Sequence, residues 1–357
     1  MAAWPLLRTT FVQPKPNLPL PMKTYSVQYA GPEKLTAFIE RHKLTSFGDR
    51  LLVQAFVDSL DETLIRELHA DLAAQLPEAA LLGATTCGSI MNGRVYEGSI
   101  VLHFIAFDAG RVRTLLLPKG SDDHELGRQL TAQLVGPETR LLILFTEAMG
   151  VSKRAVLEGV YAEQPQLCVA GGAAGSTNYG FDSWIFDRSG VSATGAVAAA
   201  IDVPQLRIQT GYALNWQPIG RVMTVTDAQD SVLHTLDGQP AAEVYRRYLG
   251  SELLENIALY GTMFPLVIDR NGVQVARTAA AVLEDGSIFF GGDIQTGDRV
   301  QFSYGHLPSI LNKTEELVDQ LQPEGYDAML LYSCVSRRAF MREAAQLETL
   351  PLQKIAP

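Results

Sequence analysis

Two short turns rich in small residues are where this sequence carries the most chemistry. The first turn offers Thr85, Thr86, Cys87 and Ser89, and the second offers Gly172, Ala173, Ser176 and Asn178. Hydroxyl groups and backbone N–H groups in such turns can bind the carboxylate or phosphate of a small ligand. We therefore predict that both turns contribute to one ligand site. The structural alternative is a pair of tight strand ends that admit only small side chains.

Three larger side chains in the last third of the chain are further candidates for that site: Trp216, Arg337 and Arg338. The two arginines follow an apolar strand and open a helix, a place where α/β folds collect ligands. An arginine there could hold a carboxylate through two parallel hydrogen bonds, and Trp216 could stack on a ligand. The alternatives are a solvated helix face for the arginines and core packing for the tryptophan.

Catalysis and metal binding find less support in the sequence. An enzyme with Cys87 or Thr86 as nucleophile is an alternative, but either residue needs an activating neighbour that the sequence does not identify. A small buried cysteine is favoured for Cys87. The six histidines show no metal-ligand spacing: His42, His69, His103, His124, His234 and His306. We therefore predict no catalytic residue, no metal and no cofactor. A single axial histidine would nevertheless suffice for haem.

An internal repeat indicates the elements that position the two turns. The run RLLVQAF at residues 50–56 returns as RLLILFT at residues 140–146, and in each copy a helical stretch and an apolar strand follow. A period of roughly 90 residues is too long for a solenoid and indicates a duplicated α/β unit. We predict mixed α/β structure, with β-α-β-β-β units at about 50–134 and 140–212. Helices flank the mixed sheet of each unit.

The later strands of each unit are predicted from alternating hydrophobicity. Residues 99–106 and 112–117 read as a hairpin on the sheet of the first unit. In the second unit, three strands read as a meander at residues 183–187, 195–201 and 206–212.

The chain divides into three predicted regions. Residues 1–21 are proline-rich and aperiodic, so we expect a disordered leader. Residues 22–214 form the duplicated N-terminal domain, and residues 215–357 form a smaller α/β domain. That domain ends with a strand at 328–334 and a helix at 336–348, as at the start of each repeat unit. Since a further strand and glycine turn are expected, we predict that the C-terminal domain is truncated at Pro357.

Charge and composition bear on the partners. The net charge is −10 and the isoelectric point about 5.1, which disfavours nucleic acid and anionic membranes as partners. No apolar stretch reaches the roughly 20 residues of a membrane-spanning helix. The three cysteines are far apart in the sequence, which fits a reducing cytoplasm. We expect a cytoplasmic protein with no membrane segment.

The repeat and several glycine motifs resemble the FIST family, whose name stands for F-box and intracellular signal transduction. The resemblance rests on residues 50–88, the second copy through GGAAG at 171–175, LDGQPA at 236–241 and DGSIFFGGD at 285–293. It implies a non-enzymatic bacterial sensory module that binds a small ligand such as an amino acid. Such modules are joined to a cyclic-di-GMP enzyme, kinase or chemoreceptor domain, and a homodimer is compatible with this organisation. Some members resemble haem-based nitric oxide sensors, which is the alternative function.

Overall fold

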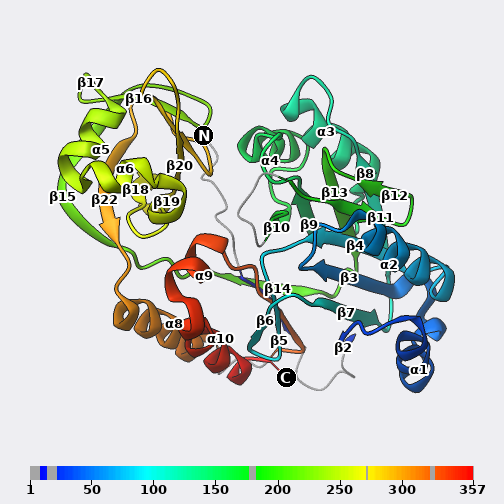
Figure 1. Cartoon of the computed structure of the whole chain (residues 1–357). Coiled ribbons are helices and arrows are strands. Elements are labelled where there is room, and N and C mark those ends of the chain that lie inside the picture. Colours follow the sequence, from blue (N-terminus) through cyan, green and yellow to red (C-terminus); the bar gives the residue numbers. More distant parts are fainter. Residues whose placement is uncertain (1–8, 14–21, 177–181, 271, 322–325, 357) are drawn as a thin grey trace. The chain divides into compact units, whose positions relative to one another are not determined.

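The computed structural model describes residues 9–13, 22–176, 182–270, 272–321 and 326–356 (Figure 1). The chain forms two compact units. The N-terminal unit comprises Leu7–Gly211, Val318–Tyr332 and Thr349–Pro357, and the C-terminal unit comprises Tyr212–Leu317 and Ser333–Glu348. The predicted mixed α/β class is confirmed, because the chain forms several sheets, two of them mixed, together with flanking helices.

The first sheet of the N-terminal unit has six strands in the order β12-β11-β4-β3-β7-β2. They are β2 (Met22–Gln28), β3 (Leu51–Val57), β4 (Ala80–Thr85), β7 (Ile100–Phe107), β11 (Ile185–Asp187) and β12 (Gly190–Ser192). Strands β3 and β4 are parallel, and β7 runs antiparallel to β3. Helix α2 (Glu62–Gln75) connects β3 to β4 and begins at an Asp61 cap, whose carboxylate accepts two backbone N–H groups.

The second sheet has four strands in the order β10-β9-β13-β8. They are β8 (Arg111–Leu117), β9 (Leu141–Thr146), β10 (Cys168–Ala173) and β13 (Ala196–Asp202). Helix α4 (Lys153–Glu163) connects the parallel strands β9 and β10, and β13 runs antiparallel to β9. The order β3-α2-β4 followed by antiparallel β7 therefore recurs as β9-α4-β10 followed by antiparallel β13.

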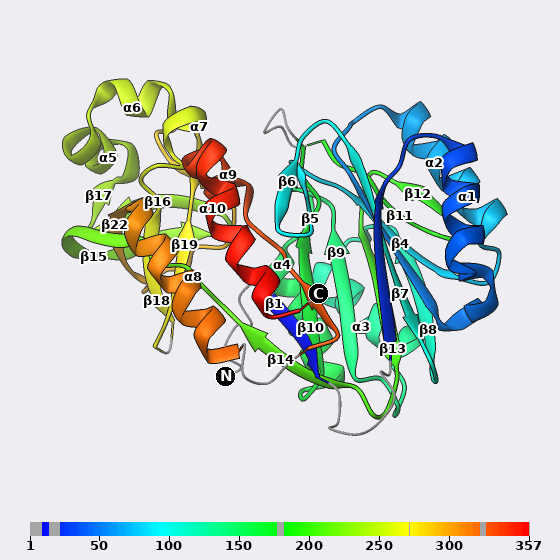
Figure 2. The ribbon, with the colours of Figure 1, turned by 90° about the horizontal axis from the view of Figure 1, so that it is seen from below.

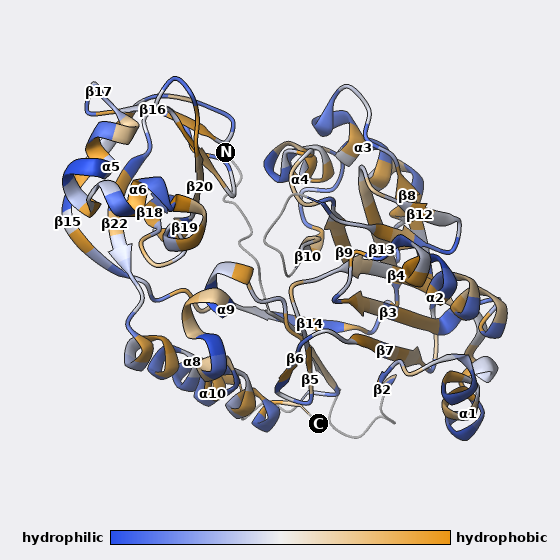
Figure 3. Ribbon diagram, in the orientation of Figure 1, coloured by the Kyte–Doolittle hydropathy of each residue, from blue (hydrophilic) through white to orange (hydrophobic). Residues whose placement is uncertain are grey.

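The two sheets pack face to face between two layers of helices. One core cluster joins Leu52 and Ile105 of the first sheet to Ile143 and Val197 of the second. Helix α2 and α1 (Pro32–His42) cover the outer face of the first sheet, next to the short helix η1 (Leu44–Arg50). Helix α4 and α3 (Asp123–Leu134) cover the outer face of the second sheet. Figure 3 shows strongly apolar strands in this unit and polar faces on its helices.

Two strand pairings predicted from the sequence are wrong, although the strands themselves form. The expected hairpin at 99–106 and 112–117 does not form, since β7 lies in the first sheet and β8 pairs with β13 in the second. The expected meander is also absent: β11 pairs with β4, β13 lies in the second sheet, and β14 (Arg207–Gly211) lies in a third. Alternation specifies which face of a strand is buried but not which strand pairs with it.

The third sheet has the order β14-β1-β23, with β1 (Thr9–Gln13) antiparallel to both neighbours. Figure 2 shows the blue strand β1 beside β14. Strand β23 (Ala328–Leu330) comes from near the end of the chain. The prediction that residues 1–21 are disordered is therefore wrong for Thr9–Gln13. These residues form a strand because β14 and β23, distant in the sequence, pair with both of its edges. The rest of the expected leader, residues 1–8 and 14–21, lies outside the described residues.

The C-terminal unit contains one long sheet in the order β19-β18-β22-β15-β16-β21-β20, with β17 paired to β16. Its strands are β15 (Gln217–Gln229), β16 (Val232–Leu236), β17 (Gln239–Pro240), β18 (Leu266–Arg270), β19 (Val273–Arg277), β20 (Ala279–Val282), β21 (Ile288–Phe290) and β22 (Arg299–Tyr304). The helices between them are α5 (Ala241–Leu249), α6 (Ser251–Glu255) and α7 (Ile257–Tyr260), and α8 (Leu307–Leu321) follows β22.

The last strand and helix differ from their predicted lengths. Strand β23 covers only three of the seven expected residues, and it runs antiparallel to β1. The expected helix at 336–348 is broken into α9 (Val335–Met341), η3 (Arg342–Ala344) and α10 (Ala345–Thr349), and η4 (Leu350–Lys354) follows. Arg342 interrupts it with a φ of 49°, outside the right-handed helical region. This segment therefore does not repeat the β-α-β start of the earlier units.

Candidate functional site

The two small-residue turns lie in contact at the carboxyl ends of β4, β9 and β10. The Gly175 N–H donates to the Thr85 carbonyl over 2.9 Å, and the Ala174 N–H donates to the Thr146 carbonyl over 2.8 Å. A side chain at Gly175 would approach the backbone nitrogen of Cys87 to 3.9 Å. The segment after β10 therefore lies between the ends of the two sheets.

Backbone hydrogen bonds fix the first turn from both sides. Thr85 is buried, its N–H donates to the Trp184 carbonyl over 2.8 Å, and its Oγ1 accepts the Trp184 N–H over 3.0 Å. The neighbouring Ser183 Oγ accepts the Ala148 N–H at the end of β9 over 2.9 Å. The Thr86 N–H donates to the Val57 carbonyl over 2.9 Å. The turn is thus held to β3 and to the segment before β11, and Ser183 of that segment joins it to the end of β9.

Thr86 carries a hydroxyl group that this network does not use. Its Oγ1 is buried and has no hydrogen-bond partner among the residues that the structure describes. A buried hydroxyl without a partner costs roughly 1–3 kcal/mol. Such a group in a native protein calls for an explanation, and a bound ligand is one. A nucleophilic hydroxyl needs a base within hydrogen-bond reach. No described residue contacts Thr86 Oγ1 in this way, so the nucleophile alternative gains no support.

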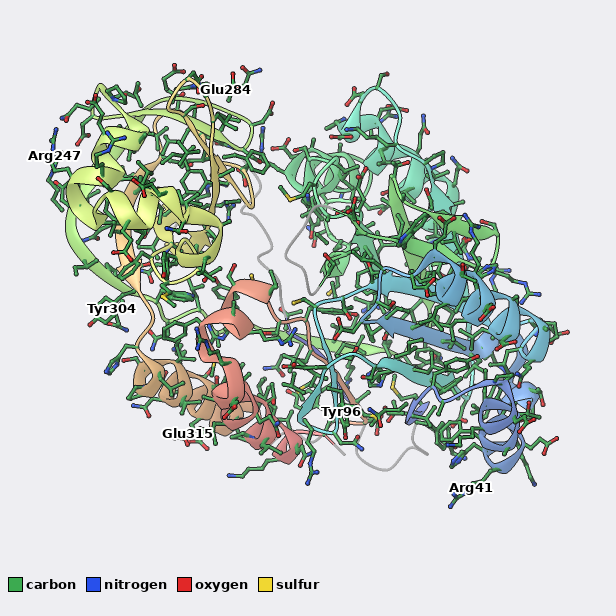
Figure 4. The ribbon with its side chains drawn as sticks, in the orientation of Figure 1. Arg41, Tyr96, Arg247, Glu284, Tyr304 and Glu315 are labelled. Atoms are coloured by element: carbon green, nitrogen blue, oxygen red, sulfur yellow. The ribbon has the colours of Figure 1, made fainter. Side chains whose placement is uncertain are left out.

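The other predicted residues of the turns differ in their solvent exposure. Ser89 is buried, and its Oγ donates to the Phe56 carbonyl over 3.4 Å. Ser176 is buried, Cys87 and Gly172 are half-buried, and Ala173 is exposed. Asn178 lies outside the described residues. Beyond Cys87 the chain forms the hairpin of β5 (Ser89–Met91) and β6 (Arg94–Tyr96), and Tyr96 is labelled in Figure 4.

Sequence reasoning missed a pair of acidic residues at equivalent places in the repeat. Asp58 follows β3 and Glu147 follows β9, and both are buried. Asp58 Oδ2 accepts the Gly98 N–H over 2.7 Å, and Glu147 Oε1 accepts the Gly195 N–H over 3.1 Å. An acidic residue directly after each copy of the repeated strand was the available signal.

A half-buried lysine lies near the second acid. Lys153, the first residue of α4, donates from Nζ to the Ala148 carbonyl. Burial lowers the pKa of Lys153 to about 8, and the carboxylates of Glu147 and Asp123 partly oppose that shift. This edge therefore has an amine that can lose its charge near neutral pH.

Arg337 is already engaged by a partner within the C-terminal unit. It is 7% exposed, and its Nε lies 2.7 Å and 2.8 Å from the two carboxylate oxygens of Glu348. Its Nη1 donates to the Leu214 carbonyl over 2.7 Å. To bind a ligand carboxylate, Arg337 would have to exchange Glu348 for it.

The remaining predicted residues also belong to the C-terminal unit. Trp216 is 4% exposed and packs on Phe340, with 5.1 Å between ring centroids. This is the core packing that the sequence offered as the alternative to stacking on a ligand. Arg338 is half-buried on the short helix α9. That these side chains join the turns of the N-terminal unit in one site stays a prediction.

Comparison with known families decides the identity. The FIST N domain matches residues 51–239, and the FIST C domain matches residues 241–357. The chain belongs to the FIST family. FIST domains are sensory domains of signal-transduction proteins, and this agrees with the predicted class. No curated protein matches the chain.

Two further findings concern membrane-spanning helices and metal sites in this FIST protein. No helix within the described residues is long and apolar enough to cross a membrane. Those residues also contain no group of three or more His, Cys, Asp or Glu side chains that could hold a metal ion.

The histidines fit haem ligation poorly where their contacts are known. His103 Nε2 lies 3.2 Å from the Ile90 carbonyl, and its Nδ1 lies 2.6 Å from the Ser26 hydroxyl. Since a carbonyl only accepts, Nε2 carries the proton and Nδ1 accepts from Ser26. Burial lowers the pKa of His103 to about 4. His69 likewise uses Nε2 on the Asp187 carbonyl over 2.8 Å.

Proposed function

We propose that this FIST protein is a cytoplasmic sensory module that binds a small polar metabolite, an amino acid or a close analogue. The turns after β4 and β10 hold the ligand. The observation that carries this proposal is the Thr86 hydroxyl, which is buried without a described partner where the two turns meet. Hydroxyl and backbone N–H groups at such a place suit a carboxylate.

The same geometry supports a role in signalling. The segment after β10 is hydrogen-bonded to the ends of β4 and β9, so a ligand between the turns would bridge elements of both sheets. A ligand can shift a conformational equilibrium only through different contacts in the two states. The segment after β10, which bonds to the ends of β4 and β9, offers such contacts. The output is proposed to come from a cyclic-di-GMP enzyme, a kinase or a chemoreceptor domain in a bacterial signalling pathway.

The test is a panel of the twenty amino acids, scored by the rise in melting temperature of the full chain. We expect at least one amino acid to stabilise the wild type. Thr86→Val should lose that response while its own melting temperature stays equal or rises, because the change removes an unpaired buried hydroxyl. Thr63→Val, at an exposed threonine of α2, is the matched control. A full response by Thr86→Val refutes the site, and no response by the wild type refutes the ligand class.

A further inference from the structure

A groove beside the carboxyl ends of β2 and β3 offers a second site. It has a volume of about 570 Å³, within the range of small-molecule pockets. The loop from Gln28 to Pro32 forms one wall, and Leu64 and Glu67 of α2 form another. Asp58 and Ser99 also line it. None of the residues of the two small-residue turns does.

Two polar atoms of the lining residues are buried and unsatisfied. Asp58 is 6% exposed, and its Oδ1 has no hydrogen-bond partner among the described residues. The same holds for Ser99 Oγ. These residues are neighbours, because the Asp58 N–H donates to the Ser99 carbonyl over 3.1 Å. The Gly98 N–H holds the other carboxylate oxygen of Asp58, which fixes the orientation of the carboxylate.

The charge of the groove is negative. Glu67 adds a carboxylate at the exposed side, and the Tyr29 hydroxyl donates to Asp71 on the same helix. Burial raises the pKa of Tyr29 above its ordinary value, and the charges of Asp71 and Glu67 raise it further. Tyr29 therefore stays protonated and neutral, so the charge of the groove comes from its carboxylates.

Cationic side chains of the neighbouring helices do not line the groove, although Lys34 lies only two residues from the lining residue Pro32. None of the described residues that line the groove is a lysine, arginine or histidine. Arg66 of α2 pairs with Glu62 over 2.7 Å, and Arg41, labelled in Figure 4, lies in the last turn of α1, whereas Pro32 begins that helix. The N–H groups of the first turn of α2 bond to the Asp61 cap, so this helix end is already compensated.

We infer that this groove binds a primary alkyl ammonium ion. Asp58 Oδ1 and Ser99 Oγ would accept the ammonium hydrogens, and Leu64 and Ile100 supply apolar surface for the alkyl stem. A hydrogen bond between an ammonium ion and a carboxylate is the strong, charge-assisted kind. A divalent cation is the weaker candidate, because Ca²⁺ takes six to eight oxygen ligands and the described residues offer no cluster of three metal-binding side chains.

The experiment is calorimetric titration of the full chain with 1,4-diaminobutane, using 1-butanol and butyrate as uncharged and anionic comparison compounds. We expect the diamine alone to bind. Asp58→Asn should weaken it about tenfold or more, as loss of one charge-assisted bond implies, and Ser99→Ala should weaken it severalfold. Glu40→Gln on α1, with the same change of net charge outside the groove, should bind like the wild type.

Several results would overturn the inference. Equal binding of 1-butanol would show an apolar pocket, and displacement of the diamine by Mg²⁺ at equal concentration would show a metal site. Unchanged affinity in Asp58→Asn, or in Ser99→Ala should Asp58→Asn not fold, would place the diamine elsewhere. Thr86→Val should bind the diamine normally, so a failure of the turn site and a failure of the groove are distinguishable.

Discussion

Acidification should destabilise this protein through one half-buried histidine, His103. In the fold, burial lowers the pKa of His103 from 6.5 to about 4, so the ring stays neutral between Ser26 and the Ile90 carbonyl. The unfolded chain takes up a proton near pH 6.5. The contribution of His103 to stability is therefore complete above pH 6.5 and is lost as the pH falls from 6.5 toward 4.

The size of the loss follows from the two pKa values. Between pH 7.5 and pH 5 the difference in proton uptake amounts to about 2 kcal/mol, and it approaches roughly 3 kcal/mol below pH 4. The affected contact holds β5 next to the Thr86–Cys87 turn, because Ile90 belongs to that strand. Loss of this contact should therefore loosen the candidate site first.

The assay is urea denaturation at pH 7.5, 6 and 5, followed by circular dichroism. The comparison variant is His103→Gln, whose amide can accept from Ser26 and donate to Ile90 but does not titrate. Carboxylates contribute equally to both proteins, so the difference between their pH profiles isolates His103. Parallel profiles, or an imidazole that titrates above pH 6 by NMR, would refute the assignment of a neutral, half-buried ring.

Three further predictions concern packing and charge. Gly159→Ala should destabilise the chain by roughly 1–3 kcal/mol, since its Cβ would lie 2.0 Å from the His124 carbonyl at the α3–α4 contact; Gly120→Ala, in open space, is the calorimetric control. Lys153 has a pKa lowered to about 8, so its burial penalty fades as the pH rises toward 10.5. Wild-type stability should gain on the order of 1–2 kcal/mol over Lys153→Met between pH 7.5 and 9.5, and an equal gain in both proteins would contradict this. Glu348→Ala should cost about 3–5 kcal/mol, because it leaves the buried Arg337 guanidinium without its carboxylate; a melting temperature within 2 °C of wild type, measured by calorimetry, would count against that ion pair.

The sequence alone determined the local architecture of this FIST protein. The repeated runs at 50–56 and 140–146 became β3 and β9, each followed by a helix and a parallel strand. The small-residue turns were predictable for the same reason, because strand, helix and turn signals are encoded in adjacent residues.

Tertiary structure alone decided the pairings between distant segments. Strand β8 joined the second sheet, β11 joined the first, and β1 gained partners from residues 207–211 and 328–330. It also assigned Glu348 to Arg337 and placed the Asp58 carboxylate on the Gly98 N–H. Hydrophobic alternation shows which face of a strand is buried but not which strand pairs with it. Likewise, a buried charged residue requires a partner, but the sequence does not show which residue that partner is. The choice among partners depends on which chain segments the packed core brings together.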